Sequence, residues 1–253
     1  MIETLDDLGT AVHLDGPPRR VVSLVPSLTE AIAETAPETL VGATQWCVRP
    51  TSLDVARVRG TKNPDLAAVI ALKPDLVVTN QEENRRVDVE RLRDAGIAVW
   101  VTRIDSVREA FTSLGRLFGE AFGLPEPGWL AEARAAWSGP PTQSRGLRVA
   151  VPIWRDPWSW VGAQTYADDV LTQMGWSNVV APEPRYPRLD PSAVLAEGPE
   201  VVLLPDEPYA FGPTDGPETL PGPRHAFISG RPLFWYGPSM AQARRELEAA
   251  VER

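Results

Sequence analysis

The sequence has little of the residue types that most catalytic and metal sites need. Its 253 residues include one cysteine, Cys47, and two histidines, His13 and His225. One cysteine cannot form an intramolecular disulfide, and we interpret Cys47 as a small buried apolar residue. The histidines lie far apart with no cysteine or carboxylate cluster at ligand spacing, which argues against a zinc or non-haem iron site. We therefore expect no metal site and no resident cofactor.

Excess basic charge and long apolar runs are also missing. The formal net charge is -9, whereas general nucleic-acid binding depends on basic patches that release counterions. No stretch approaches the roughly 18 apolar residues of a membrane span. The first twenty residues are acidic and lack the apolar run of a signal peptide. As written, the chain is expected in the cytoplasm, and in the periplasm or outside the cell if an export signal is missing from it.

Common catalytic motifs are absent as well. The sequence has no G-x-S-x-G elbow, no phosphate-binding P-loop, no G-x-G-x-x-G and no H-E-x-x-H. Cys47 and a distant histidine have no third group that would orient a base. We assign no catalytic residue, and we expect a binding protein rather than an enzyme.

Strand and helix patterns alternate along the chain. Short runs rich in β-branched residues predict strands at 20–25, 40–44, 75–79, 98–102 and 147–151. Helical patterns occur at 27–35, 65–72, 87–95, 106–122 and 126–137, and Ser27 with Glu30 matches a capping box at the first of them. This alternation is typical of the α/β class with mostly parallel sheets.

An internal repeat indicates two related lobes. Residues 65–82 align without gaps to residues 190–207, an offset of 125, across a helix, a turn and a strand. We therefore predict two Rossmann-like lobes with mostly parallel central sheets: an N-terminal α/β lobe at 1–123, an interlobe helix at 124–140 and a C-terminal α/β lobe at 141–253. If the strand ends of both sheets face each other, a ligand would bind in the cleft between them.

The richest candidate binding segment follows the first strand of the second lobe. Residues 153–162 contain Trp154, Arg155, Trp158 and Trp160. A flat indole can stack on a planar ligand, and a guanidinium can meet a carboxylate, an amide or a phosphate. The alternative is a tryptophan-rich minicore under a long loop.

Other candidates also follow predicted strands or turns. For each of them alone, core packing or a solvated turn is as good an explanation as ligand contact, but their shared placement favours a ligand. These candidates are Trp46, Arg49, Asn80, Tyr209, Phe211, Trp235 and Tyr236. Glu82 and Glu207 occupy equivalent places in the repeat. They are either solvated loop carboxylates or a symmetric pair that arginines of a two-fold symmetric partner could bind.

The ordered set of these segments resembles the substrate-binding proteins of ABC importers whose lobes are joined by a helix. That group binds vitamin B12 and ferric siderophores, and the similarity is greatest to a cobalamin-binding branch. It extends from residue 19 to 237 through RVVSLVPSLTEAIAE, LVGATQWC, ALKPDLVVTNQEEN, VERLRDAGIAVWV, IWRDPWSWVGAQTYADDVLTQMGWSNVV, YPRLD, EPYAF and WYG.

The resemblance implies capture of a corrinoid or a ferric siderophore in an interlobe cleft for import. It implies cleft positions for Trp46, Trp154, Arg155, Trp158 and Tyr209, and docking on an ABC transporter permease dimer through Glu82 or Glu83 and through Glu207. The bridge at 126–137 would be about 18 Å long at about 1.5 Å per residue, shorter than is usual in the family. The alternative function is an intracellular enzyme or handling protein for a tetrapyrrole-like or other small metabolite on the same scaffold.

Overall fold

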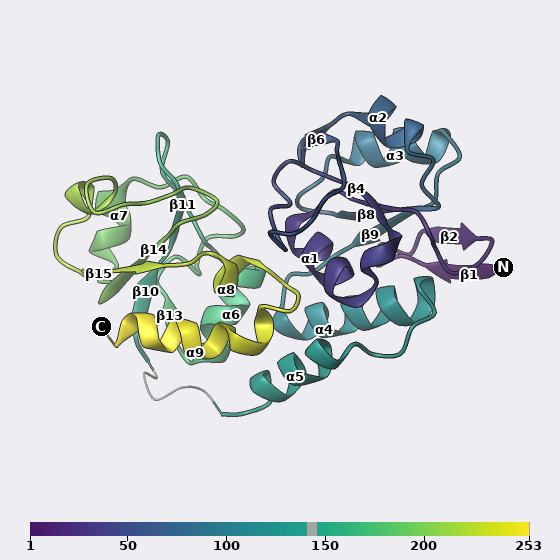
Figure 1. The fold of residues 1–253 in the computed structure, drawn as a ribbon. Helices are drawn as coiled ribbons and strands as arrows, with labels where there is room; N and C mark the ends of the chain where they lie inside the picture. Colours follow the sequence, from purple (N-terminus) through teal and green to yellow (C-terminus); the bar gives the residue numbers. More distant parts are fainter. Residues whose placement is uncertain (141–145, 253) are drawn as a thin grey trace. The chain divides into compact units, whose positions relative to one another are not determined.

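The computed structural model describes residues 1–140 and 146–252, which form two compact units (Figure 1). Unit 1 consists of Met1–Ile104, Glu109–Ala131 and Tyr236–Pro238, and unit 2 of Asp105–Arg108, Glu132–Trp235 and Ser239–Arg253. The predicted start of the second lobe at residue 141 lies outside the described residues. Each unit is described by itself.

Unit 1 is built on a five-stranded parallel sheet with the order β5-β4-β3-β8-β9. Its strands are β3 Val21–Ser23, β4 Leu40–Ala43, β5 Ala56–Arg57, β8 Leu76–Asn80 and β9 Val99–Thr102. All residues of β3, β8 and β9 are buried. Strands of a parallel sheet that is covered on both faces read as continuous apolar runs, which is why the sequence revealed them.

The helices of unit 1 follow these strands as predicted. They are α1 Pro26–Thr35, α2 Leu66–Ala71 and α3 Arg86–Asp94, with a 3-10 turn η1 at Pro37–Thr39 and a small antiparallel pair of β6 Arg59–Gly60 and β7 Asn63–Pro64. The capping box was wrong. Helix α1 begins at Pro26 with Val25 as its N-cap and no side-chain cap, because proline fits the first helical turn, where its missing N–H is not needed.

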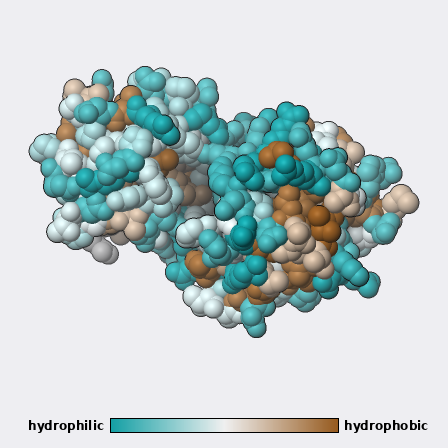
Figure 2. Space-filling model, turned by 90° about the horizontal axis from the view of Figure 1, so that it is seen from above, coloured by the Kyte–Doolittle hydropathy of each residue, from teal (hydrophilic) through white to brown (hydrophobic). Residues whose placement is uncertain are grey.

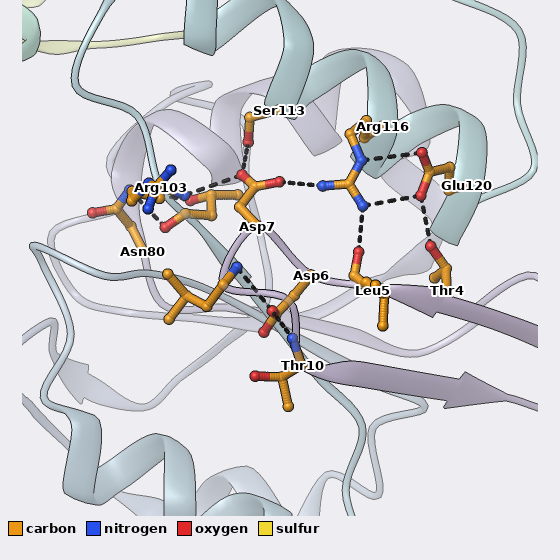
Figure 3. Close-up of polar contacts among 12 residues, drawn as sticks. Thr4, Leu5, Asp6, Asp7, Thr10, Asn80, Arg103, Ser113, Arg116 and Glu120 are labelled. Atoms are coloured by element: carbon orange, nitrogen blue, oxygen red, sulfur yellow. Dashed lines mark hydrogen bonds and ion pairs between the residues drawn. The ribbon is translucent and has the colours of Figure 1, made fainter.

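A hairpin that the sequence analysis did not predict precedes the sheet. It consists of β1 Ile2–Leu5 and β2 Ala11–Leu14, paired antiparallel. Figure 3 shows how its turn is anchored: the carboxylate of Asp7 accepts hydrogen bonds from Arg116 Nη1 at 2.7 Å, from the backbone N–H of Arg103 at 3.0 Å and from the Ser113 hydroxyl at 2.5 Å. The guanidinium of Arg116 also binds Glu120. The three donors to Asp7 lie about 100 residues later in the sequence, so the hairpin is held by distant parts of the chain.

The amphipathic pattern at 106–122 forms a helix in two parts. Helix α4, Val107–Arg116, continues into a π-helical turn η2 at Leu117–Ala121. Every apolar residue of the predicted stripe is buried: Val107, Ala110, Phe111, Leu114, Leu117, Phe118 and Phe122. Helix α5, Gly128–Trp137, starts two residues later than predicted, and the division between the units falls inside it, after Ala131.

Unit 2 contains a four-stranded parallel sheet with the order β13-β10-β14-β15. Its strands are β10 Arg148–Ala150, β13 Ser177–Asn178, β14 Val201–Pro205 and β15 Arg224–Ile228, and β11 Pro152–Trp154 pairs antiparallel with β12 Ser159–Trp160. The helices are α6 Tyr166–Met174, α7 Pro191–Ala196, α8 Arg231–Phe234 and α9 Met240–Val251, with a 3-10 turn η3 at Pro217–Thr219. Two mostly parallel sheets with helices confirm the predicted α/β class.

The repeat is present in the backbone as well as in the sequence. Helix α2 and strand β8 of unit 1 correspond residue for residue, at the offset of 125, to helix α7 and strand β14 of unit 2. Each helix has an aspartate N-cap. Asp65 accepts from the backbone N–H of Ala68, and Asp190 accepts from that of Ser192.

Matching arginines at the other end of these helices extend the correspondence. The guanidinium of Arg20 donates to the carbonyls of Leu72 and Lys73, and that of Arg148 donates to the carbonyls of Glu197 and Gly198. A cation at a helix C-terminus satisfies orphan carbonyls and opposes the helix dipole. The two units therefore share a local device that the sequence alignment alone did not include.

Among the described residues, no helix combines the length and the apolar character that a membrane crossing requires.

Candidate functional site

Five aromatic side chains of unit 2 form one continuous series, which we call the aromatic ladder: Trp160, Trp158, Phe211, Tyr209 and Trp154. Trp158 stacks nearly parallel on Trp160 and on Phe211, with ring centroids 5.6 and 5.8 Å apart. Phe211 is tilted against Tyr209 at 4.7 Å, and Tyr209 meets Trp154 edge to face at 5.4 Å. These are favourable geometries for aromatic pairs.

The ladder runs from the core to the surface. Trp160 is fully buried, and its indole N–H donates to the carbonyl of Leu189 at 3.0 Å. Phe211 is also buried, whereas Trp154 at the other end is 49% exposed. The inner end is thus the minicore that the sequence left open as an alternative, and the outer end is an exposed aromatic surface. Ligand contact by Trp160 and Phe211 stays a prediction.

Two loops at the carboxyl ends of parallel strands carry the ladder. Trp154 and Trp160 lie on the β11–β12 pair, which follows β10, and Trp158 lies in the turn that joins these two strands. Tyr209 and Phe211 lie in the loop after β14. The backbone N–H of Phe211 donates to Pro205 at the end of β14. Gly216, with a φ of 122°, gives Phe211 room, because a Cβ at that position would lie 2.9 Å from its ring. Carboxyl-end loops are where open α/β sheets bind ligands.

Arg155 lies beside the ladder and already has acidic partners. Its guanidinium stands 5.4 Å from the ring centroid of Trp158. Nη1 donates to Asp215 Oδ1 and, at 2.6 Å, to Glu218 Oε1, and Nε lies 3.6 Å from Asp156 Oδ2. From the sequence, Arg155 is predicted to meet a carboxylate, an amide or a phosphate of a ligand. In this structure it meets carboxylates of its own unit, and a contact with a ligand stays a prediction.

The hydrogen bonds fix the charge state of this cluster. The hydroxyl of Tyr209 donates to Asp215 Oδ2 at 2.7 Å, and this bond, together with that from Arg155, lowers the pKa of Asp215. The bond from Arg155 lowers the pKa of Glu218. The neighbouring carboxylate of Asp215 raises the pKa of Tyr209. At neutral pH the carboxylates are therefore ionised and Tyr209 keeps its proton.

Sequence reasoning did not find Asp215 and Glu218. Both lie between residues 206 and 220, a loop with four acidic residues and no lysine or arginine. This excess of acidic residues could have indicated a cationic partner for the loop. That partner, Arg155, lies about 60 residues earlier, and its identity depends on how the two loops fold.

In unit 1, the loop after β4 presents Trp46 and Arg49 to solvent. Trp46 is 61% exposed, and Arg49 is exposed as well. Between them, Cys47 is fully buried, and its Sγ lies 3.0 Å from the hydroxyl of Thr29. Burial raises the pKa of the Cys47 thiol. Cys47 therefore anchors the loop as a small buried residue, as expected, while its neighbour Trp46 faces outward.

Asn80 builds the loop after β8 rather than facing solvent. It is buried, its Oδ1 accepts from the backbone N–H groups of Glu82 and Glu83, and its Nδ2 donates to Thr102. The Oδ1 of Asn84, a residue that was not among the sequence-predicted candidates, accepts a hydrogen bond from the backbone N–H of Asn80 at 2.8 Å. This loop holds Glu82 and Glu83 in place, and ligand contact by Asn80 stays a prediction.

The docking candidates differ in their surroundings. Glu83 accepts a hydrogen bond from the buried hydroxyl of Tyr236 at 3.2 Å. Burial above all, and then the nearby charge of Glu83, raise the pKa of Tyr236. Glu82 and Glu207 are half-buried at equivalent places in the two units, and Glu207 packs closely against Gly230, where a Cβ would lie 2.5 Å from it. Docking by all three glutamates stays a prediction.

Trp235 is the last candidate, and it is buried. The guanidinium of Arg231 stands 5.3 Å from its ring centroid. The structure thus brings six of the predicted residues of unit 2 together, namely the aromatic ladder and Arg155, and it leaves Trp235 outside that group. Figure 2 shows a mainly hydrophilic surface, on which hydrophobic residues gather on the face of unit 1 that is in view.

Comparison with known proteins shows what the chain is similar to. No protein-family model matches the sequence. A protein of Halobacterium salinarum named cobalamin-binding protein is 31% identical over 214 residues, which cover 78% of this chain and 57% of that protein. The chain is therefore similar in sequence to a protein named for cobalamin binding. It spans a little over half the length of this relative.

Two further likenesses agree with that relation. The vitamin B12-binding protein of Salmonella choleraesuis is 28% identical over 195 residues, covering 73% of this chain and 71% of that protein. The periplasmic heme-binding protein RhuT from Roseiflexus sp. RS-1, in apo form, has a TM-score of 0.76 and 22% identity, covering 92% of this chain and 97% of that one. The latter likeness shows that the two proteins share a fold, and the sequence relatives are named as binding proteins rather than enzymes.

Proposed function

We propose that the chain is a substrate-binding protein that captures a corrinoid of the vitamin B12 kind for an ABC-type importer. The observation that carries the proposal is the aromatic ladder of unit 2, whose outer end, the exposed Trp154 against the half-buried Tyr209, follows the carboxyl ends of parallel strands. An extended flat ring system can stack on such a surface with little loss of side-chain entropy.

The sequence relatives support the corrinoid rather than another ligand of this fold. Their names specify cobalamin and vitamin B12, whereas the structural neighbour RhuT, with its lower identity, is named for heme. A periplasmic or extracellular setting and a permease partner follow from the same proposal, because a binding protein of an importer meets its ligand outside the cytoplasm.

Titration with cyanocobalamin, followed by quenching of tryptophan fluorescence, tests the proposal. We expect saturable quenching by the corrinoid and weaker or no quenching by a ferric hydroxamate siderophore. If neither the corrinoid nor hemin binds to protein that is shown to be folded by circular dichroism, the proposal fails. Binding of hemin or of the siderophore alone would replace the corrinoid by that ligand.

Trp154→Ala tests the role of the ladder. Removing its exposed end should weaken corrinoid binding about tenfold, which is ~1.4 kcal/mol, because aromatic anchors carry much of the energy of such contacts. Phe227→Ala is the matched control, since Phe227 is a similarly exposed aromatic residue, 46% exposed, on strand β15 of the same unit and outside the ladder. An unchanged affinity in Trp154→Ala would remove the ladder from the ligand surface.

A further inference from the structure

The cluster of charges beside the exposed end of the aromatic ladder has the wrong sign for an acidic ligand. Among the ion pairs that the described residues form there, Arg155 supplies the cation, and it faces Asp156, Asp215 and Glu218. One guanidinium against three carboxylates leaves a local charge of about -2. All three carboxylates are substantially exposed, from 43% for Asp215 to 86% for Asp156.

Arg155 is also poorly placed to bind an anionic ligand. Its Nη1 is shared between Asp215 and Glu218, and only 19% of its side chain is exposed. A ligand carboxylate that approached Nη1 would therefore compete with two ionised carboxylates of the protein. Because the bond from Arg155 lowers the pKa of Glu218, and the bonds from Tyr209 and Arg155 that of Asp215, neither leaves as a neutral acid near pH 7.

The carboxylates also adjoin the aromatic surface itself. Tyr209, which meets Trp154 edge to face, donates a hydrogen bond from its hydroxyl to Asp215. Arg155 in turn lies over Trp158 and binds the same Asp215. A macrocycle stacked on Trp154 and Tyr209 therefore has part of its rim in the neighbourhood of these carboxylates, which can accept hydrogen bonds from amide N–H groups and repel carboxylates.

We propose that this unit selects a macrocycle whose rim carries amides and rejects the equivalent macrocycle whose rim carries free carboxylates. The inference rests on the proposed function, since it assigns the chemical class of the ligand at that same surface. It predicts discrimination between ligands of identical ring structure by side-chain charge alone. It also predicts discrimination against hemin, whose propionates are ionised at neutral pH.

The test compares two corrinoids that share ring, metal and axial ligands. Dicyanocobinamide carries amides on its rim, and dicyanocobyrinic acid carries carboxylates. We expect the amide form to bind at least about tenfold more tightly at ~20 mM salt, since several like-charge pairs separated by about 5 to 10 Å each cost roughly a factor of two to four in water. The ratio should fall to about two- or threefold at ~0.5 M salt, where the Debye length is near 4 Å.

The double variant Asp215→Asn/Glu218→Gln tests whether the ratio of the two affinities depends on these residues. It removes two negative charges and releases Arg155, so the affinity for the carboxylate form should rise and the ratio should approach one. Glu246→Gln/Glu252→Gln is the matched control, because it removes the same charge from exposed residues of α9 and its C-cap, outside the ladder loops. Near-UV circular dichroism checks that both variants retain the wild-type fold.

The outcomes separate this inference from the proposed function. If dicyanocobinamide, dicyanocobyrinic acid and hemin all fail to bind, the proposed function itself is wrong. If dicyanocobinamide binds but the carboxylate form binds equally well, the selectivity is overturned while the function stands. A ratio that is the same in the Asp215→Asn/Glu218→Gln variant and in the wild type would also overturn the inference, because the discrimination would then arise elsewhere.

Discussion

At the scale of single residues, the neighbours of a side chain decide its role more than its type does. Trp154 and Trp160 come from the same tryptophan-rich segment, yet one is 49% exposed and the other is fully buried with a satisfied indole N–H. Arg155 shows the same point. Its residue type suits it to bind an anionic ligand, but two acidic side chains of its own unit occupy it.

The ion cluster around Arg155 predicts a specific pH dependence of stability. Asp215 and Glu218 have lowered pKa values in the folded protein, so they bind fewer protons there than in the unfolded chain at acidic pH. Their contribution is therefore fully present above the unfolded pKa values of about 4, and it is lost as the pH falls through the lower folded values.

Urea unfolding of the wild type and of Asp215→Asn/Glu218→Gln between pH 3 and 7.5 measures this contribution. The variant should be the less stable of the two by a constant difference from pH 5.5 to 7.5, and the difference should shrink below pH 4. A difference that is as large at pH 3 as at pH 7 would contradict the assignment. Glu246→Gln/Glu252→Gln, which lacks the pairing with Arg155, should not reproduce the pattern.

At the scale of elements, the helix–strand repeat carries its own stabilising contacts. Helices α2 and α7 have six residues each, too few for independent stability. An aspartate at the N-cap and an arginine at the last carbonyls supply the missing partners at both ends, in both units. The sequence shows the aspartates as identical residues in the repeat, but the arginines lie outside it and emerged only from the fold.

The N-cap of α2 can be tested directly. Asp65→Ala should lower the free energy of unfolding of unit 1 by about 1 kcal/mol, because the backbone N–H of Ala68 loses its acceptor. Asp65→Asn keeps an acceptor and should retain most of the stability. Urea unfolding monitored by tryptophan fluorescence suits the measurement, since Trp100 is buried in unit 1.

Asp54→Ala is the control for the loss of one exposed carboxylate in the same unit. If it destabilises the protein as much as Asp65→Ala does, the effect is one of charge and not of capping. Asp190→Ala in the second unit should act in the same direction as Asp65→Ala, since its side chain accepts from Ser192.

At the scale of the whole molecule, the duplicated architecture gives each unit one glutamate in the same local position. Glu82 follows β8 and Glu207 follows β14, and each is half-buried. A two-fold symmetric permease could bind such a pair with equivalent arginines, one from each subunit. Glu83 differs from both, because it accepts a hydrogen bond from Tyr236 within unit 1.

Charge reversal separates docking from ligand capture. Glu82→Lys/Glu207→Lys should abolish most corrinoid uptake by cells that depend on this protein, while the purified variant binds the corrinoid within about twofold of the wild type. Glu38→Lys/Glu246→Lys makes the same change of charge at exposed glutamates away from the repeat loops and should leave uptake intact. Full uptake by the first variant would remove Glu82 and Glu207 from the docking surface.

The sequence by itself determined the α/β class, the repeat, strands β3, β4, β8, β9 and β10 and helices α1 to α5, because buried strands and amphipathic helices leave apolar patterns in a local window. It misplaced the start of α1, where proline replaced the expected serine cap, and it did not indicate the β1–β2 hairpin, whose anchors Ser113 and Arg116 lie about 100 residues away.

Only the tertiary structure decided which aromatic residues form the ladder, which of them are exposed, and that Arg155 is held by Asp215 and Glu218. The contacts of Trp158 with Phe211 and of Arg155 with its two carboxylates join loops about 50 to 60 residues apart, and no local pattern encodes the pairing of distant loops. The chemistry of the candidate site, including the sign of its charge, therefore follows from the fold and not from the segment that first drew attention to it.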